Sequence, residues 1–166
     1  MPSGAWTRCA WTSATPRITT WLARNLAQVK TLLDIREEYT ERALQEADPR
    51  AREYLVRYAR DFYPLAIRGR MTEARTSVER ALTRTSSEVE QRFLADAMER
   101  LRRAEEAETA AEEMLAELFD RQDLADAERA ALREKLREKG RMLVREARLL
   151  SLNLDERVVQ AVLRAE

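Results

Sequence analysis

Apolar side chains recur every three or four residues along most of the chain, which is the spacing of one face of an α-helix. The first such stripe follows Thr15 and Pro16, a pair typical of a helix N-cap and first turn. It predicts a helix that runs to about Asp48. Asp48 and Pro49 repeat the same start signal, and a second apolar stripe extends from there to about Arg84.

Two residues within this second stripe are poor helix formers. Pro64 has no amide hydrogen and its ring crowds the preceding turn, so it predicts a break or kink near Phe62. Gly69 predicts a second interruption, because glycine is costly inside a helix. We therefore expect two or three helical pieces between residues 49 and 84.

A capping box begins the next helix. Ser87 and Glu90 have the spacing at which the hydroxyl and the carboxylate each bind a backbone amide of the other residue. The helix that follows should reach Phe119 or Asp120 and carries a heptad seam of leucine and alanine, with Glu108 as its polar exception. The expected seam residues are Leu94, Ala97, Leu101, Ala104, Ala111, Leu115 and Leu118.

The C-terminal part predicts another long helix and a short one. Asp123 and Asp126 are a candidate capping pair for the long helix, which contains Gly140 as a weak point. Asn153 or Asp155 would cap the short terminal helix. With no pattern that indicates strands, the expected fold is all-α: an elongated helical bundle of antiparallel hairpins, with coiled-coil-like long helices.

Charge alternates in sign along the chain although the net charge is zero. Residues 1–33 carry a net +4, residues 34–48 a net −4, residues 49–84 a net +5, residues 85–120 a net −7 and residues 121–166 a net +2. Because opposite charges attract, neighbouring helices of opposite sign favour antiparallel hairpins over one extended rod.

Composition divides the chain into three parts. Residues 1–14 form an arm that contains tryptophan and arginine, residues 15–84 form a helical part rich in aromatic residues, and residues 85–166 form a long-helix hairpin rich in Ala, Glu, Arg and Leu.

The sequence excludes much of the chemistry of enzymes. It has no histidine, so imidazole bases and histidine metal ligands are absent. A single cysteine, Cys9, cannot form a disulfide within the chain, and three scattered glycines leave no phosphate-binding loop. We therefore expect a non-enzymatic protein with no catalytic residues, no metal, no cofactor and no small-molecule substrate.

The segment from residue 1 to 33 has no acidic residue and combines tryptophans with arginines. One interpretation is a mitochondrial targeting signal, a second is a segment bound at a membrane surface, and a third is a structural arm that packs on the core or a partner. The candidate contact residues for a partner or a membrane are Trp6, Trp11, Arg17, Trp21 and Arg24. The expected location is intracellular, cytoplasmic or mitochondrial, without a choice between the two.

A basic, tyrosine-bearing stretch lies between residues 49 and 84. Arg52, Arg57 and Arg60, beside Tyr54 and Tyr58, are candidate contacts to RNA or DNA, because rings stack on bases and guanidinium groups bind phosphate. The alternative that we favour places the tyrosines on the core face and the arginines on its solvated flank, since the isoelectric point is near 6.5.

Glutamates cluster between residues 105 and 113. Glu108 and Glu112 stand four residues apart and could share a divalent cation, although a solvated helix face is the favoured interpretation.

Together these features predict a structural or adaptor protein that acts by protein–protein association, as a homo-oligomer or as an accessory subunit of a larger assembly, with a mitochondrial assembly as one interpretation. Narrow leucine and alanine stripes need a partner helix to cover them. The expected association residues are therefore six of the seam residues: Leu94, Leu101, Ala104, Ala111, Leu115 and Leu118. The alternatives are a nucleic-acid-binding module that uses residues 49–84 and a membrane-surface protein anchored by residues 1–33.

Overall fold

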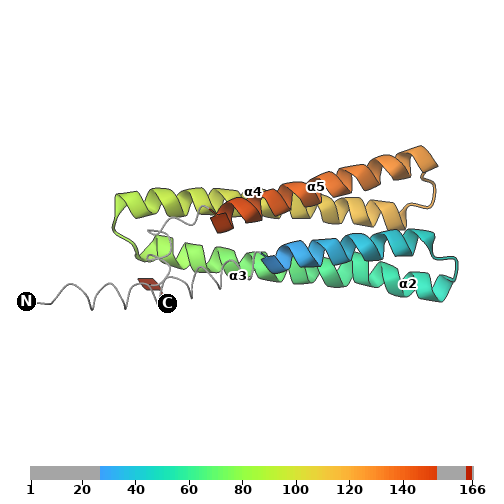
Figure 1. Cartoon of the computed structure of the whole chain (residues 1–166), viewed down its shortest axis with the longest axis horizontal. Helices are drawn as coiled ribbons and strands as arrows, with labels where there is room; N and C mark the ends of the chain where they lie inside the picture. The colour runs from blue at the N-terminus through green and yellow to red at the C-terminus, as the bar shows by residue number, and fades with distance from the viewer. Residues whose placement is uncertain (1–26, 153–163, 166) are drawn as a thin grey trace, which may run out of the picture.

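The computed structural model describes residues 27–152 and 164–165, and it confirms the all-α fold class (Figure 1). In the described part of the chain the helical segments lie side by side and are joined by short loops at alternate ends of the molecule. No strand occurs in the described part of the chain, and none of its helices is long and apolar enough to cross a membrane. The elements are an N-terminal helix described over residues 27–45, α2 (Pro49–Arg57), the π-helical turn η1 (Tyr58–Phe62), α3 (Tyr63–Arg84), α4 (Glu88–Asp120) and α5 (Asp126–Leu152).

Two predicted helix starts are present. The Asp48 side chain accepts a hydrogen bond from the Ala51 amide at 3.3 Å, and Pro49 begins α2. The Ser87 hydroxyl accepts a hydrogen bond from the Glu90 amide at 3.4 Å and caps α4. These bonds satisfy amides that a helix start leaves without an intrahelical partner.

The capping box is nevertheless used in an unexpected way. The Glu90 carboxylate accepts a hydrogen bond from the Thr85 hydroxyl and pairs with Arg164, and both contacts lower the pKa of Glu90. The Arg84 guanidinium also donates to the carbonyl of Ala165. Residues 164–165 are thus attached to the end of α3 and the start of α4.

The cap predicted at the start of α5 is wrong. The helix begins at Asp126, and Asp123 lies in the preceding loop, where its carboxylate pairs with Arg121 at 3.2 Å. The predicted short helix after Asn153 or Asp155 lies largely outside the described residues, and so does the predicted start at Thr15 and Pro16.

The interruption expected near Phe62 takes the form of a π-turn: α-helical hydrogen bonding stops at Arg57 and resumes at Tyr63, while the chain stays helical through η1, so that α2, η1 and α3 form one rod. The interruption expected at Gly69 does not occur. The Tyr63 amide donates to the carbonyl of Tyr58, five residues earlier, and Pro64 follows this wider turn at the start of α3. A π-turn removes the α-helical geometry in which the proline ring would meet the carbonyl four residues before it. Gly69 lies inside α3 with helical neighbours on both sides.

The π-turn also keeps one face of this rod on the core. Leu55, Ala59, Ile67 and Met71 are all buried and are separated by multiples of four residues. Each four-residue step overshoots the face of an α-helix by about 40°, so the four steps from Leu55 to Met71 would turn the face away. The wider turn between Tyr58 and Phe62 offsets this drift.

The heptad seam of α4 lies inside the molecule. Leu94, Leu101 and Leu115 are at most 2% exposed, and α3 and α5 both pack against α4. One core cluster joins α3, α4 and α5, and a second joins the N-terminal helix to α3, α4 and α5. The expectation that this seam needs a second chain is therefore wrong. The other seam residues are buried as well: Ala97, Ala104, Glu108, Ala111 and Leu118.

Candidate functional site

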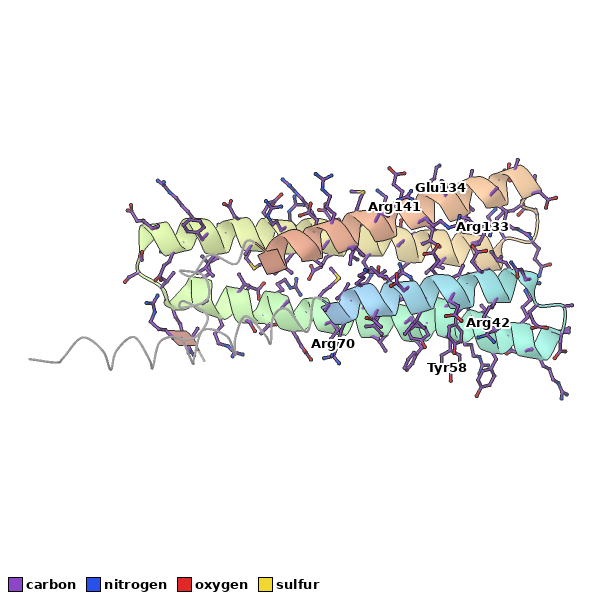
Figure 2. The ribbon with its side chains drawn as sticks, in the orientation of Figure 1. Arg42, Tyr58, Arg70, Arg133, Glu134 and Arg141 are labelled. Carbon is purple, nitrogen blue, oxygen red and sulfur yellow. The ribbon has the colours of Figure 1, made fainter. Side chains whose placement is uncertain are left out.

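An aromatic cluster lies on the outer side of the N-terminal helix, α2, η1 and the first turn of α3. Figure 2 shows Tyr58 and Arg42 projecting from this edge of the molecule. Ring centroids of neighbouring members are 5.2 to 6.2 Å apart, with tilted or edge-on geometry, which is the range of favourable aromatic pairs. We call this set the aromatic patch: Tyr39, Tyr54, Tyr58, Phe62 and Tyr63.

The local sequence explains why these rings face outward. Tyr54, Tyr58 and Phe62 stand four residues apart and form a stripe beside the one that contains the buried Leu55 and Ala59. Tyr54 is 65% exposed and Phe62 is 56% exposed. The interpretation that placed these tyrosines on the core face is wrong, because smaller side chains fill that face.

The hydroxyl group of Tyr63 carries no charge at neutral pH. Burial raises the pKa of Tyr63, and the neighbouring Tyr39, Tyr58 and Glu38 raise it further. The Arg42 guanidinium carbon lies 5.4 Å from the centre of the Tyr39 ring, so a cation rests on one edge of the patch. The aromatic patch and its edge therefore present aromatic rings, hydroxyl groups and the guanidinium group of Arg42 on one surface.

The arginines predicted to contact nucleic acid lie near the patch but are largely neutralised. Arg57 pairs with Glu53 at 3.1 Å, and Arg60 pairs with Asp61 at 3.3 Å and with Asp120 of α4. Arg52, on the same helix, is exposed. Binding to phosphate requires positive charge that is not already compensated, so these pairs weigh against a nucleic-acid surface.

A buried ion pair crosses the interior between the N-terminal helix and α4. Arg36 Nη1 donates to Glu108 Oε1, and the two side chains are only 4% and 1% exposed. Within the described part of the chain, Glu108 Oε2 has no hydrogen-bond partner. Burial raises the pKa of Glu108 to about 7, against the lowering effect of the Arg36 charge. The sequence pattern favoured a solvated helix face for Glu108. That interpretation is wrong, because the side chain is buried.

Each carboxylate of the candidate metal pair is occupied by an arginine. Glu112, four residues after Glu108, accepts two hydrogen bonds from Arg68 Nε, at 2.6 and 2.8 Å, and it also pairs with the terminal Nη2 nitrogen. In the described residues no group of three or more acidic or cysteine side chains is placed to hold a metal ion.

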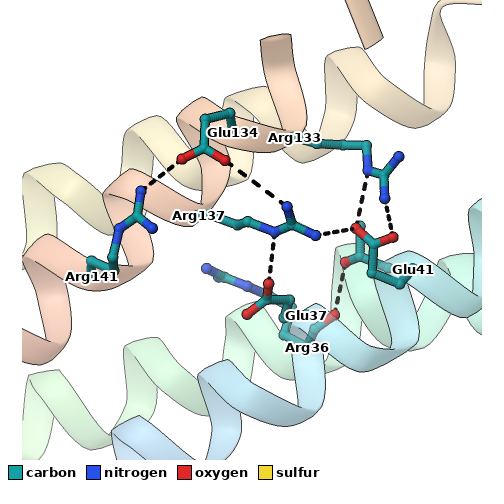
Figure 3. A network of polar contacts seen from close by, with 8 residues as sticks. Arg36, Glu37, Glu41, Arg133, Glu134, Arg137 and Arg141 are labelled. Atoms are coloured by element: carbon teal, nitrogen blue, oxygen red, sulfur yellow. Dashed lines mark hydrogen bonds and ion pairs between the residues drawn. The ribbon is translucent and has the colours of Figure 1, made fainter. Parts of the chain in front are cut away.

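A second network links the N-terminal helix to α5 (Figure 3). Arg137 lies at its centre, with its guanidinium 2.9 Å from Glu37 and 3.2 Å from Glu41. Arg133 also binds Glu41, through Nε at 3.0 Å and through Nη2. The heptad pattern of α4 carries no information about this network, and the only signal of it in the sequence is the preference for arginine over lysine, 27 to 3.

The five predicted contact residues of the N-terminal segment, from Trp6 to Arg24, lie outside the described residues. Comparisons with known proteins add no relative: no protein family, no curated protein and no solved structure matches this chain.

Proposed function

We propose that this chain is a non-enzymatic structural or adaptor protein that acts by association with other proteins or with copies of itself, and that the aromatic patch is its contact surface. The observation that carries this proposal is the exposure of large rings in one contiguous place. Tyrosine, phenylalanine and arginine are the residue types enriched where proteins bind each other. A clustered, exposed apolar surface is also unusual for a surface that faces only water.

Because the α4 seam is buried within the chain, association would occur at the aromatic patch and not at the seam. Exposed apolar side chains remain the reason to expect association. Leu65, just beyond the patch, is 72% exposed and extends the apolar surface along α3. Rings of tyrosine lose little conformational freedom on binding, because they have only two side-chain torsions. Mutual stacking of Tyr39, Tyr58 and Tyr63 holds the surface in a fixed shape before a partner arrives.

The proposal also covers how the helices are arranged in the bundle. We infer an elongated bundle of antiparallel hairpins in which α4 and α5 pack in the manner of a coiled coil. The 33 residues of α4 span about 50 Å. A compact chain of this length would have a radius of gyration of about 15 Å, so small-angle scattering should give a clearly larger value.

The test of the association proposal uses variants of exposed rings. Tyr54→Ser combined with Phe62→Ser removes the two most exposed members of the patch, and Val89→Ser combined with Met142→Ser is a matched control. Val89 and Met142 are 46% and 44% exposed and lie on α4 and α5. All four substitutions should leave thermal unfolding nearly unchanged, because the side chains are already largely in water.

Two measurements then compare these variants. Sedimentation velocity reports self-association, and a photo-crosslinking amino acid at position 62 identifies neighbours in cells of the native source. We expect the patch variant to lose the self-associated species or the crosslinked complex, and the control variant to retain it. A monomeric protein without a position-specific crosslink would contradict the proposal, as would a complex that both variants form equally well.

The nucleic-acid alternative makes a different prediction for the same patch. It requires salt-dependent retention on RNA that is lost when Arg52, Arg57 and Arg60 are all changed to Gln. The protein-association proposal predicts no such retention, because Arg57 and Arg60 already have carboxylate partners.

A further inference from the structure

A groove runs between the N-terminal helix and α5, on the side of the N-terminal helix away from the aromatic patch. Its volume is about 650 Å³, which lies within the range of sites that hold small molecules. Its walls come from residues 30–41 and residues 133–145.

The floor of this groove is apolar. Leu136, Gly140 and Val144 stand four residues apart along α5, and Leu33 faces them from the N-terminal helix. No atom lies within 4 Å of the position that a Cβ would take at Gly140. The space above the glycine is therefore open, and a helix interior tolerates this residue at a cost of about 1 kcal/mol relative to alanine.

The two ends of the groove differ in charge. At one end Arg133 is bound to Glu41 and Arg137 is bound to Glu37 and Glu41, so their charges are compensated and they bridge the two walls. At the other end Lys30 and Arg145 are exposed, and neither has an ion-pair partner among the described residues. The exposed Asp34 also lines this end, so two cations face one carboxylate and the excess charge is positive. The groove spans about 18 Å from residue 133 to residue 145 of α5.

We propose that this groove binds a single-chain amphiphile with an anionic head group, with its alkyl chain along the apolar floor and its head between Lys30 and Arg145. A purely polar anion would leave the floor in contact with water. A partner helix, about 10 Å wide, would have to separate walls that Arg133 and Glu41 hold together. A narrow chain with one charged end matches both the shape and the position of the uncompensated charge.

The first test blocks the floor. Gly140→Leu places a side chain in the open space, and Gly69→Leu is the matched control, since no atom lies within 4 Å of a Cβ there either. Titration calorimetry with palmitate, below its micellar concentration, should show one site in the wild-type protein and in the Gly69 variant. We expect the Gly140 variant to bind at least tenfold more weakly, with helix content and melting temperature preserved.

The second test concerns the head group and the chain length. Lys30→Gln combined with Arg145→Gln should weaken palmitate binding at least tenfold. Lys135→Gln combined with Lys139→Gln removes the same charge from α5, outside the residues that line the groove, and should not weaken it. Myristate, two methylene groups shorter, should bind the wild-type protein on the order of tenfold more weakly, because less apolar surface is buried.

The ligand could be a free fatty acid or a lipid released from a membrane, and monomeric lysophosphatidylglycerol distinguishes the two sources. Competition between this lipid and palmitate supports the proposal, and their relative affinities indicate the source. Absence of palmitate and lysolipid binding overturns the proposal, as does palmitate binding that Gly140→Leu leaves unchanged. Binding only to phosphatidylglycerol vesicles overturns it too, since a surface other than the groove would then be responsible.

Discussion

Glu108 offers the sharpest test of the interior, because it is a buried carboxylate whose proton equilibrium differs between the folded and unfolded chain. The substitution Glu108→Gln keeps the shape of the side chain and an oxygen that accepts a hydrogen bond from Arg36, but it cannot become charged. Comparing this variant with the wild-type protein isolates the cost of the buried charge from the effects of all other titrating groups.

The sign of the effect follows from the pKa of Glu108. Folding raises this pKa from 4.5 to about 7, so the folded chain binds more protons than the unfolded chain between these values. The contribution of Glu108 to the free energy of unfolding is therefore most favourable below pH 4.5 and falls as the pH rises to 7. A shift of this size corresponds to a loss of about 3 kcal/mol.

Urea unfolding followed by circular dichroism, from pH 4.5 to pH 8, measures this loss. We expect Glu108→Gln to have about the stability of the wild-type protein at the acid end and to be more stable by up to about 3 kcal/mol at pH 8. Glu108→Leu should instead be destabilised by about 3 to 5 kcal/mol, because it leaves the Arg36 charge buried without an acceptor. A Gln variant that is several kcal/mol less stable at pH 8 would refute the reasoning, since attraction to Arg36 would then outweigh desolvation.

The remaining predictions concern helix ends and helix geometry. Ser87→Ala should lower the free energy of unfolding by about 1 kcal/mol, measured in urea, because the Glu90 amide loses its acceptor. Gly69→Ala should raise the melting temperature and add up to about 1 kcal/mol, because the site is helical and open. In a Pro64→Ala background, deletion of Asp61 should convert the π-turn to α-helix and preserve cooperative unfolding. Deletion of Arg103 from α4 in the same background is the control. It should lower the melting temperature much more than deletion of Asp61 does, because it turns half of the seam away from the core by about 100°.

Periodicity located most of the helices because local signals determine them. The caps at Asp48 and Ser87 depend on residues at most three positions away, and the α4 seam depends on a repeat within one helix. Such signals can be read without knowing what the helix packs against. The form of the interruption near Pro64, a π-turn and not a break, has the opposite origin, since it keeps the buried Leu55 and Ile67 on one face of the helix.

The functional residues were harder to infer because they depend on pairs that are distant in sequence. Arg36 and Glu108 are 72 residues apart, and Arg133 and Glu41 are 92 residues apart. The sequence marked Glu108 as a polar exception in an apolar seam but contained nothing that identified its partner. The aromatic patch was misplaced for a related reason: a stripe of tyrosines beside a stripe of Leu55 and Ala59 does not reveal which of the two faces the core.

The N-terminal helix connects these findings, because it carries part of every candidate site. Tyr39 belongs to the aromatic patch, Leu33 to the floor of the groove, and Arg36 to the buried pair. Its described buried apolar side chains are few and small, since they are Val29, Leu33 and Ala43, and much of its attachment comes from charge. The ion pairs to α5 are partly exposed and therefore weaken in salt, whereas the Arg36 pair is shielded from solvent. As the salt concentration rises, the contacts between the N-terminal helix and α5 should therefore weaken before the contact between Arg36 and Glu108 does.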